Sequence, residues 1–251
     1  MKARAAIVVV GSEILRGVVQ DTNSHYLAKR LTELGFSVTR IIAVPDSHED
    51  IAWALRESMS AADVVVATGG LGFTRDDITL EAAAAVLGRR LVLSAEALEM
   101  VKSRVSGEVT YQVKAAYIPE GSKPLYNPVG VSPGVYLRVG EKHLFFLPGV
   151  PREMVGVFEE SVVPLLLKAF GGAFSKTITV VTRHEREAEV DELIAPLRSK
   201  YPDVYFKTHA TTPVRLSVTI TAESREELEE KCERVVRDLK SALRVERVEA
   251  G

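Results

Sequence analysis

The stretch VVVATGGLGFTRDDITLEAAAAVLG, residues 64–88, decides the fold and carries the first candidate site. Its apolar start runs into the glycines of GGLG, and an alanine-rich segment follows. This order is typical of a buried strand, a tight turn and a helix. In such a turn backbone N–H groups converge on an oxyanion, and the helix N-terminus adds positive charge. The stretch therefore predicts a phosphate-binding loop, although it matches neither the Walker pattern nor the dinucleotide pattern G-x-G-x-x-G.

Outward from this stretch, apolar β-branched runs alternate with segments of helical period. The runs are short and continuous, as in the buried strands of a parallel sheet. They cover residues 5–10, 37–44 and 63–69. The helical segments between them cover residues 26–34 and 51–59. This alternation predicts an α/β domain with helices on both faces of a mostly parallel sheet, and a ligand site outside the carboxyl ends of the strands.

A second, smaller domain is expected near the C-terminus. A helix over 151–170 closes the first domain, and GGAFS at 171–175 has the composition of a flexible connector. The remainder predicts a strand, a helix, two strands and a helix, the order of a small α+β sandwich. These elements are expected at residues 176–182, 185–199, 203–209, 214–222 and 224–242. We therefore place an α/β domain at residues 1–170 and a small α+β domain, without a catalytic role, at residues 175–251.

Composition limits the partners. The 32 basic and 34 acidic residues leave a formal net charge of −2 without blocks of like charge, which argues against nucleic acid or an anionic membrane as partner. The longest apolar run, AAIVVV from Ala5, is too short to span a bilayer. The single cysteine, Cys232, cannot form an internal disulfide. We expect a cytoplasmic protein whose partner is a small molecule.

The acidic residues near the glycine loop have two interpretations. Thr74 stands three residues before Asp77, the spacing of a helix capping box, and SHED at 47–50 repeats the arrangement. Capping leaves Asp46 and Asp76 unexplained. Carboxylates and phosphate share a site when a divalent cation lies between them, and Mg²⁺ prefers that mixture of ligands. We therefore predict that Asp46, Asp76 and Asp77 are catalytic and that Asp46 and Asp77 bind Mg²⁺, with capping as the open alternative for Asp77.

Four separated motifs resemble one family in order and spacing. They are VVVGSEILRGVVQDTNSHYLAKRLTELGFSVTRIIAVPDSHEDI, ATGGLGFTRDDITLEA, NPVGVSPG and LPGVPREM. Over residues 4–168 the chain resembles the molybdenum-cofactor-biosynthesis, or molybdopterin-binding, domain family, and within it the N-terminal domain of the CinA proteins. The tail from residue 175 is similar to the small α+β domain that follows in that branch.

The resemblance implies a three-layer α/β/α domain that binds molybdopterin or a relative of the adenine nucleotides. In molybdopterin adenylyltransferase relatives the acids matching Asp46 and Asp77 are essential, and CinA-type domains are associated with metal-dependent ADP-ribose pyrophosphatase activity. A homo-oligomer is also implied. Two features depart from the CinA branch. Phe73 stands where that branch commonly has proline, and the sequence ends before the deamidase domain of full-length CinA proteins, so no deamidase activity is expected.

The same motifs supply candidate ligand-binding residues, and we expect a diphosphate against the amides of residues 69–74. The candidates are Gly11, Ser12, Glu13, Asp21, Thr22, Asn23, Gly69, Gly70, Leu71, Gly72, Thr74, Asn127, Gly130, Pro133, Gly134, Pro148, Gly149 and Glu153. The local alternative is that Asp21 or Thr22 caps a helix, and that the glycines and prolines after residue 126 only shape turns.

Three functions stay open. A Mg²⁺-dependent hydrolase would use water to cleave a nucleotide pyrophosphate such as ADP-ribose. A molybdopterin adenylyltransferase would let a dithiolene phosphate attack ATP at the same loop. A binding module without catalysis would need the glycine loop but not the surplus acids.

Overall fold

The computed structural model describes residues 3–171 and 174–250. The chain divides into two units, Met1–Leu31 with Phe36–Gly171 and Thr32–Gly35 with Gly172–Gly251. Each unit has its own sheet and hydrophobic core.

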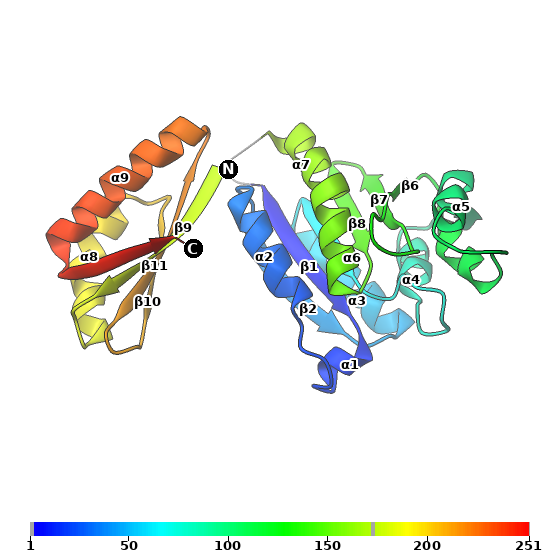
Figure 1. The fold of residues 1–251 in the computed structure, drawn as a ribbon, viewed down its shortest axis with the longest axis horizontal. Coiled ribbons are helices and arrows are strands. Elements are labelled where there is room, and N and C mark those ends of the chain that lie inside the picture. The colour runs from blue at the N-terminus through cyan, green and yellow to red at the C-terminus, as the bar shows by residue number, and fades with distance from the viewer. Residues whose placement is uncertain (1–2, 172–173, 251) are drawn as a thin grey trace. The chain divides into compact units, whose positions relative to one another are not determined.

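The first unit is built on a six-stranded sheet (Figure 1). Its strands are β1 (Arg4–Val10), β2 (Ser37–Val44), β3 (Val64–Thr68), β6 (Lys123–Leu125), β7 (Gly134–Val139) and β8 (Lys142–Leu147). They lie in the order β2-β1-β3-β8-β7-β6, of which the first four are parallel and the last two antiparallel. The apolar runs of β1 and β3 are buried, since both faces of the sheet are covered.

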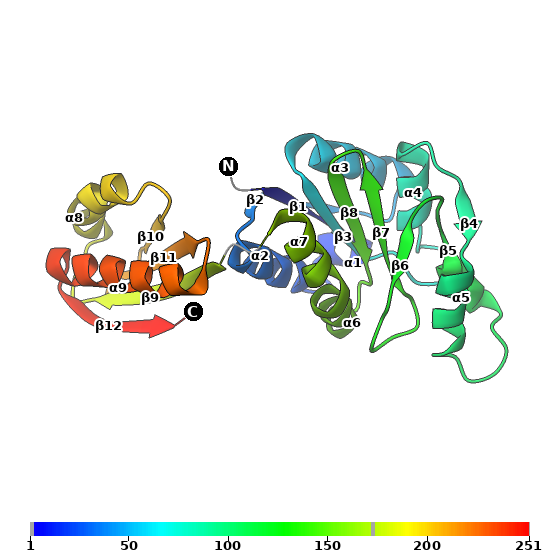
Figure 2. The ribbon, with the colours of Figure 1, turned by 90° about the horizontal axis from the view of Figure 1, so that it is seen from above.

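Helices cover the two faces of this sheet (Figure 2). One side carries α3 (His48–Ala61) and α4 (Thr79–Val86), and the other carries α2 (Asn23–Glu33), α6 (Pro151–Val157) and α7 (Val163–Phe170). A π-helical turn, Phe158–Val162, joins α6 to α7, so the helix expected over 151–170 is present. The remaining elements are α1 (Ser12–Leu15), β4 (Leu91–Leu93), α5 (Ala95–Lys102), a 3₁₀ turn (Tyr111–Ala116) and β5 (Tyr117–Pro119). The predicted three-layer, mostly parallel α/β architecture is confirmed.

The strand order creates a switch point between β1 and β3. The chain leaves β1 toward β2 on one side, whereas the next sheet neighbour of β3 is β8 on the other side. Crossovers that depart in opposite directions leave a crevice outside the carboxyl ends of the two strands. The glycines after Val10 and Thr68 stand at this crevice.

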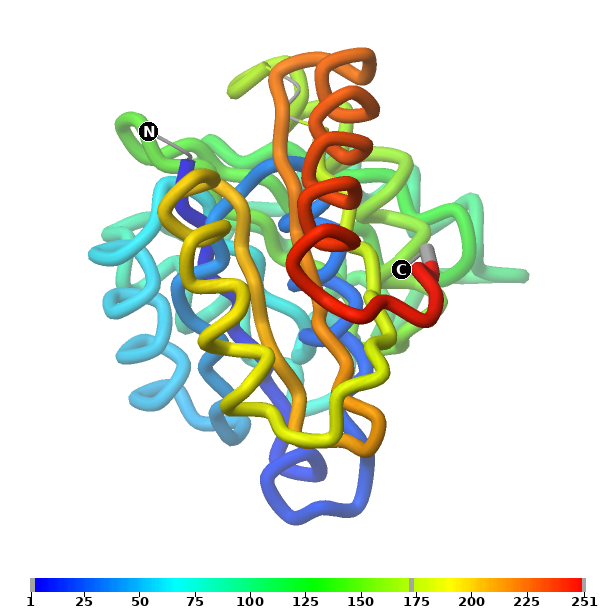
Figure 3. The backbone as a smooth tube through the Cα atoms, turned by 90° about the vertical axis from the view of Figure 1, so that its left-hand side faces the viewer, coloured from blue at the N-terminus to red at the C-terminus, as the bar shows by residue number. Residues whose placement is uncertain are grey.

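The second unit is an antiparallel sheet covered by two helices. Its elements are β9 (Phe174–Thr182), α8 (Glu187–Lys200), β10 (Tyr205–His209), β11 (Arg215–Ala222), α9 (Arg225–Ala242) and β12 (Val245–Ala250). The strand order is β10-β11-β9-β12, the split β-α-β topology of ferredoxin-like folds. Figure 3 shows α8 and α9, yellow and orange to red, lying over the strands, and both helices contribute to one apolar cluster.

One strand of this unit was missed from the sequence. The predicted order stopped at the helix over 224–242, but β12 follows and pairs with β9. Its sequence, VERVEA, has charged residues between its two valines, as edge strands often do, and so lacks a buried-strand signal. No helix in the described parts of the chain is both long and apolar enough to cross a membrane.

Candidate functional site

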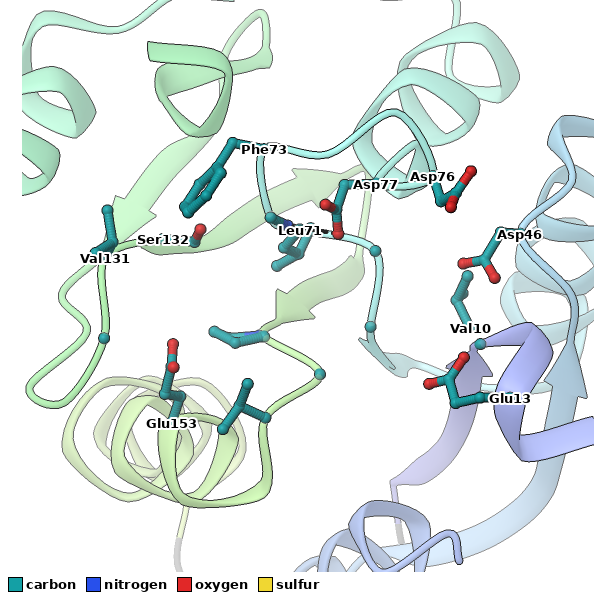
Figure 4. Close-up of a pocket in the computed structure, with 18 of the residues that line it drawn as sticks. Val10, Glu13, Asp46, Leu71, Phe73, Asp76, Asp77, Val131, Ser132 and Glu153 are labelled. Atoms are coloured by element: carbon teal, nitrogen blue, oxygen red, sulfur yellow. Dashed lines mark hydrogen bonds between the residues drawn. The ribbon is translucent and has the colours of Figure 1, made fainter. Parts of the chain in front are cut away.

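A cavity of about 620 Å³ lies at the switch point of the first unit (Figure 4). This volume is in the range of small-molecule sites. The walls come from the ends of β1, β2 and β3, the glycine loop, the 129–132 loop and the start of α6. The lining residues are Val10, Gly11, Glu13, Asp46, Gly69, Gly70, Leu71, Gly72, Phe73, Asp76, Asp77, Val129, Gly130, Val131, Ser132, Pro148, Gly149, Val150, Arg152 and Glu153.

Glycine is required at the floor of the cavity. Gly69 has φ +102°, and a Cβ there would lie 2.0 Å from the carbonyl oxygen of Val10. A Cβ on Gly149 would lie 3.3 Å from the Cα of Gly69. The loops after β3 and β8 therefore touch backbone to backbone. The Gly69 amide donates a hydrogen bond to the carbonyl oxygen of Leu147, with an N···O distance of 3.1 Å, and this bond holds the two loops together.

Asp77 organises the glycine loop from within. Its carboxylate accepts hydrogen bonds from the backbone amides of Gly72 and Thr74, each at 2.8 Å, and from the Thr74 hydroxyl at 2.6 Å. The capping interpretation of Asp77 is wrong, because α4 begins only at Thr79 and has no side-chain cap. Ile78 stands between Asp77 and the helix and occupies the N-cap position, which the sequence spacing did not reveal.

Three amides of the loop remain available. In the described part of the chain the backbone N–H groups of Gly70, Leu71 and Phe73 donate no hydrogen bond, whereas those at 69, 72 and 74 are already used. Unpaired donors beside a cavity bind either water or a ligand acceptor. Free amides in a glycine loop at a strand end are the donors with which proteins bind oxyanions.

Asp46 ties the end of β2 to the end of β1. Its Oδ2 accepts from the Ser12 amide at 2.8 Å, and its own amide donates to the Ser12 hydroxyl at 3.2 Å. Ser47, the next residue, caps α3 by accepting from the Asp50 amide, so the capping prediction for SHED is confirmed. Within the described residues, Oδ1 of Asp46 and the carboxylate of Asp76 make no hydrogen bond or ion pair.

The cavity is strongly acidic. Five carboxylate side chains and one basic side chain, Arg152, line it. Figure 4 shows Glu13, Asp46 and Asp76 gathered at one end. No three acidic, histidine or cysteine side chains within the described residues form a metal site by themselves. These carboxylates fit Mg²⁺ only together with phosphate oxygens and water, which is the ligand mixture that this ion prefers.

The opposite wall is held by Asn127 and Glu153. Asn127 is buried, and its Oδ1 accepts from the amides of Val129 at 3.0 Å and Gly130 at 2.8 Å. Its Nδ2 donates to the carbonyl of Ser132 and to Oε2 of Glu153, at 2.8 and 2.9 Å. Pro151 begins α6, as predicted, and Glu153 lies in the same first turn of the helix. The 127–132 loop is therefore wrapped around the Glu153 carboxylate.

Many predicted site residues meet at the cavity, and the others lie behind its walls. Those that line it are Gly11, Glu13, Asp46, Gly69, Gly70, Leu71, Gly72, Asp76, Asp77, Gly130, Pro148, Gly149 and Glu153. Those that do not are Ser12, Asp21, Thr22, Asn23, Thr74, Asn127, Pro133 and Gly134. Ser12, Thr74 and Asn127 hold lining residues in place through the hydrogen bonds described above.

The DTN segment has a structural role. Asp21 accepts from the Ser24 amide at 2.9 Å and also from its hydroxyl, so it caps α2, as the local alternative stated. Asn23 is buried and donates to the Thr68 hydroxyl and the Gly149 carbonyl, at 3.0 and 2.8 Å. Asn23 thereby joins the end of β3 to the loop after β8, the two segments that form the floor of the cavity.

Sequence reasoning missed Arg152, Ser132 and the role of Phe73 as a wall. Arg152 stands in the first turn of α6, where a cation is unfavourable to the helix dipole. A basic residue at a helix start, beside a predicted phosphate loop, was a usable signal. Ser132 and Phe73 gave none, because their positions depend on how two distant loops meet.

The fold and cavity are typical of a class of α/β domains that bind small molecules at the switch point of a mostly parallel sheet. Comparison with known proteins makes this more specific. Residues 6–168 match the family described as a probable molybdopterin binding domain, and the chain belongs to that family. It is a CinA-like member, so the likeness noted in the sequence is confirmed.

Three similar proteins illustrate the relationship. A relative from Pyrobaculum calidifontis is 45% identical over 209 residues, which are 82% of this chain and 80% of that protein. A CinA-like protein from Dictyoglomus thermophilum is 38% identical over 247 residues, which are 96% of this chain and 59% of that protein. The crystal structure of the protein CinA, of unknown function, from Thermoplasma acidophilum is similar with a TM-score of 0.62 and 36% identity, over 65% of this chain and 98% of that one.

Proposed function

We propose that this chain binds a phosphorylated nucleotide or pterin at the glycine loop and, with Mg²⁺, hydrolyses a pyrophosphate bond such as that of ADP-ribose. One observation carries the proposal: three unpaired amides, of Gly70, Leu71 and Phe73, border a cavity whose charged side chains are acidic except for Arg152. Amides alone would favour phosphate, and carboxylates alone would repel it. Both together suit a phosphate that arrives with a divalent cation.

The residues divide the work between binding and activation. The free amides would donate hydrogen bonds to phosphate oxygens, and the Arg152 side chain, which also lines the cavity, would offset phosphate charge. Bound Mg²⁺ would neutralise phosphate charge as it develops. Asp46 and Asp76 are the preferred metal-side carboxylates, because they have oxygens without hydrogen bonds, whereas both oxygens of Asp77 are engaged with the loop.

In hydrolysis a water oxygen attacks one phosphorus and the bond from that phosphorus to the bridging oxygen breaks. The water proton passes to a carboxylate that does not hold the metal, for which Glu13 is suited because it lies at the same end of the cavity as Asp46 and Asp76. ADP-ribose would give AMP and ribose 5-phosphate.

The second candidate is adenylyl transfer to molybdopterin. Its support is the family, described as a probable molybdopterin binding domain. A pterin phosphate would then take the place of water as nucleophile at the same loop. A module that binds without catalysis is the third possibility, and it leaves the surplus acids without a role.

One experiment separates the three. The purified chain is incubated with ADP-ribose, NAD, ATP, or ATP plus molybdopterin, with Mg²⁺ or with EDTA, and AMP and adenylylated pterin are measured. AMP from ADP-ribose in Mg²⁺ alone supports the hydrolase, and adenylylated pterin supports the transferase. Ligand binding without either product would leave the binding module.

A further inference from the structure

The cavity has two chemically different ends (Figure 4). Glu13, Asp46 and Asp76 gather at one end, where the proposed phosphate and metal lie. Phe73, Val131, Ser132 and Glu153 surround the other. The glycine loop lies between them, so a ligand whose phosphate sits on the loop extends naturally toward the second end.

Phe73 provides a flat apolar wall at this second end. Its ring packs against Tyr111 with the ring centroids 5.4 Å apart at 53°. Phe73 also lines the cavity. Val129 and Val131 also line the cavity, so apolar side chains from two loops border it together with the ring. Such a slot suits a planar aromatic ring, which gains stacking energy that does not depend on its identity.

Glu153 supplies the polar edge of that slot. Asn127 donates to its Oε2, and Asn127 is itself fixed by the Val129 and Gly130 amides. The carboxylate is therefore held in one orientation. Within the described residues its Oε1 makes no hydrogen bond. An ionised carboxylate only accepts hydrogen bonds, so the free oxygen calls for an N–H group and repels a carbonyl.

We propose that Phe73 and Glu153 form a subsite for an aminated planar heterocycle, whose exocyclic amine donates to Oε1 of Glu153. The chemical class includes adenine and pterin and excludes rings with a keto group at that position. The subsite rests on the proposed phosphate site, because the phosphate fixes which part of the ligand reaches Glu153.

The test compares two nucleotides that differ in one group. ADP has an amine where inosine diphosphate (IDP) has a keto oxygen, and their phosphates and ribose are identical. Binding of each to the full chain with Mg²⁺ is measured by calorimetry. The parent should bind ADP about tenfold or more tightly than IDP, because the keto oxygen would face the carboxylate.

Glu153→Gln should reverse the preference. Asn127 donates toward this side chain, so it will select the amide oxygen of the glutamine and leave the NH₂ group in the place of Oε1. The NH₂ group of the glutamine can donate a hydrogen bond to the keto oxygen of IDP but not to the amine of ADP. IDP should then bind at least as tightly as ADP. Phe73→Ala should weaken both nucleotides about tenfold and leave their ratio intact.

Glu160→Gln is the matched control. It makes the same change in the same long helical segment, at an exposed residue that does not line the cavity, and the ratio should stay at the parent value. Equal binding of ADP and IDP by the parent, or an unchanged ratio in Glu153→Gln, overturns the subsite and leaves the phosphate site standing. Failure of both nucleotides to bind the parent overturns the proposed function itself.

Discussion

At the scale of single residues, Asp77 and Asp76 are neighbours with different tasks. Asp77 accepts three hydrogen bonds from the loop, whereas Asp76 is exposed and makes none within the described residues. Asp77→Asn keeps one acceptor oxygen but turns an NH₂ group toward a donor. We expect the free energy of unfolding to fall by about 1–2 kcal/mol and the loop to lose its shape. Turnover should fall on the order of a hundredfold with it.

Asp76→Asn is the partner experiment. It should leave the free energy of unfolding within about 0.5 kcal/mol of the parent, since no contact is lost. Mg²⁺-dependent AMP release from ADP-ribose should nevertheless fall on the order of a hundredfold, because a metal-side charge is removed. Thermal melting and AMP assays on the two variants check both statements. An Asp77→Asn variant that melts like the parent but is inactive would assign Asp77 directly to the chemistry.

At the scale of elements, Glu159 links the π-helical turn to α2. It forms an ion pair with Arg30 at 2.7 Å and accepts from the Tyr26 hydroxyl at 2.7 Å. The hydrogen bond from Arg30 lowers the pKa of Glu159 below its ordinary value of 4.5, although burial opposes this. Burial, together with Glu159, raises the pKa of Tyr26 to about 12. The pair therefore stays charged and bonded across the neutral range.

A pH dependence follows from this link. A depressed carboxyl pKa stabilises the fold above the unfolded value and loses that effect as the pH falls through the folded value. Melting temperature should thus decline below about pH 4.5 in the parent, and Glu159→Gln should remove part of the decline. The exposed Glu160→Gln should retain it in full. If the melting temperatures of all three proteins fall in the same way below about pH 4.5, the interaction of Glu159 with Arg30 and Tyr26 has no net effect on stability.

The elements also show what a sequence can predict. The strands at 4–10 and 64–68 were predictable because burial on both faces requires a continuous apolar run. The strand at 37–44 is present where it was predicted, but the expectation that it is buried is wrong, because it is the edge strand of the sheet and most of its residues are partly or fully exposed. The start of α4 was not predictable, since Asp77 bonds back into the loop and not forward to a helix. β12 was missed because an edge strand needs backbone pairing more than apolar residues. The acids of the cavity were predictable from position, but its heterocycle end depends on loops that meet only in three dimensions.

At the scale of the whole molecule, all residues that line the cavity belong to the first unit. The second unit has a core of its own, to which α9 contributes the buried Cys232. Residues 1–171 alone should therefore unfold in one cooperative transition and bind ADP with Mg²⁺ within about threefold of the full chain. Calorimetry on both proteins tests this. Loss of binding in a folded 1–171 fragment would show that the second unit contributes to the site.

The contact between Gly69 and Gly149 restricts which parts of the cavity can be redesigned. A Cβ on Gly69 would lie 2.0 Å from the Val10 carbonyl oxygen, so no side chain fits there, and a Cβ on Gly149 would press against Gly69. We therefore expect ligand preference to change more readily through Phe73 and the 129–132 loop than through these glycines. A library made to select new ligands should keep both glycines and randomise Phe73 and that loop.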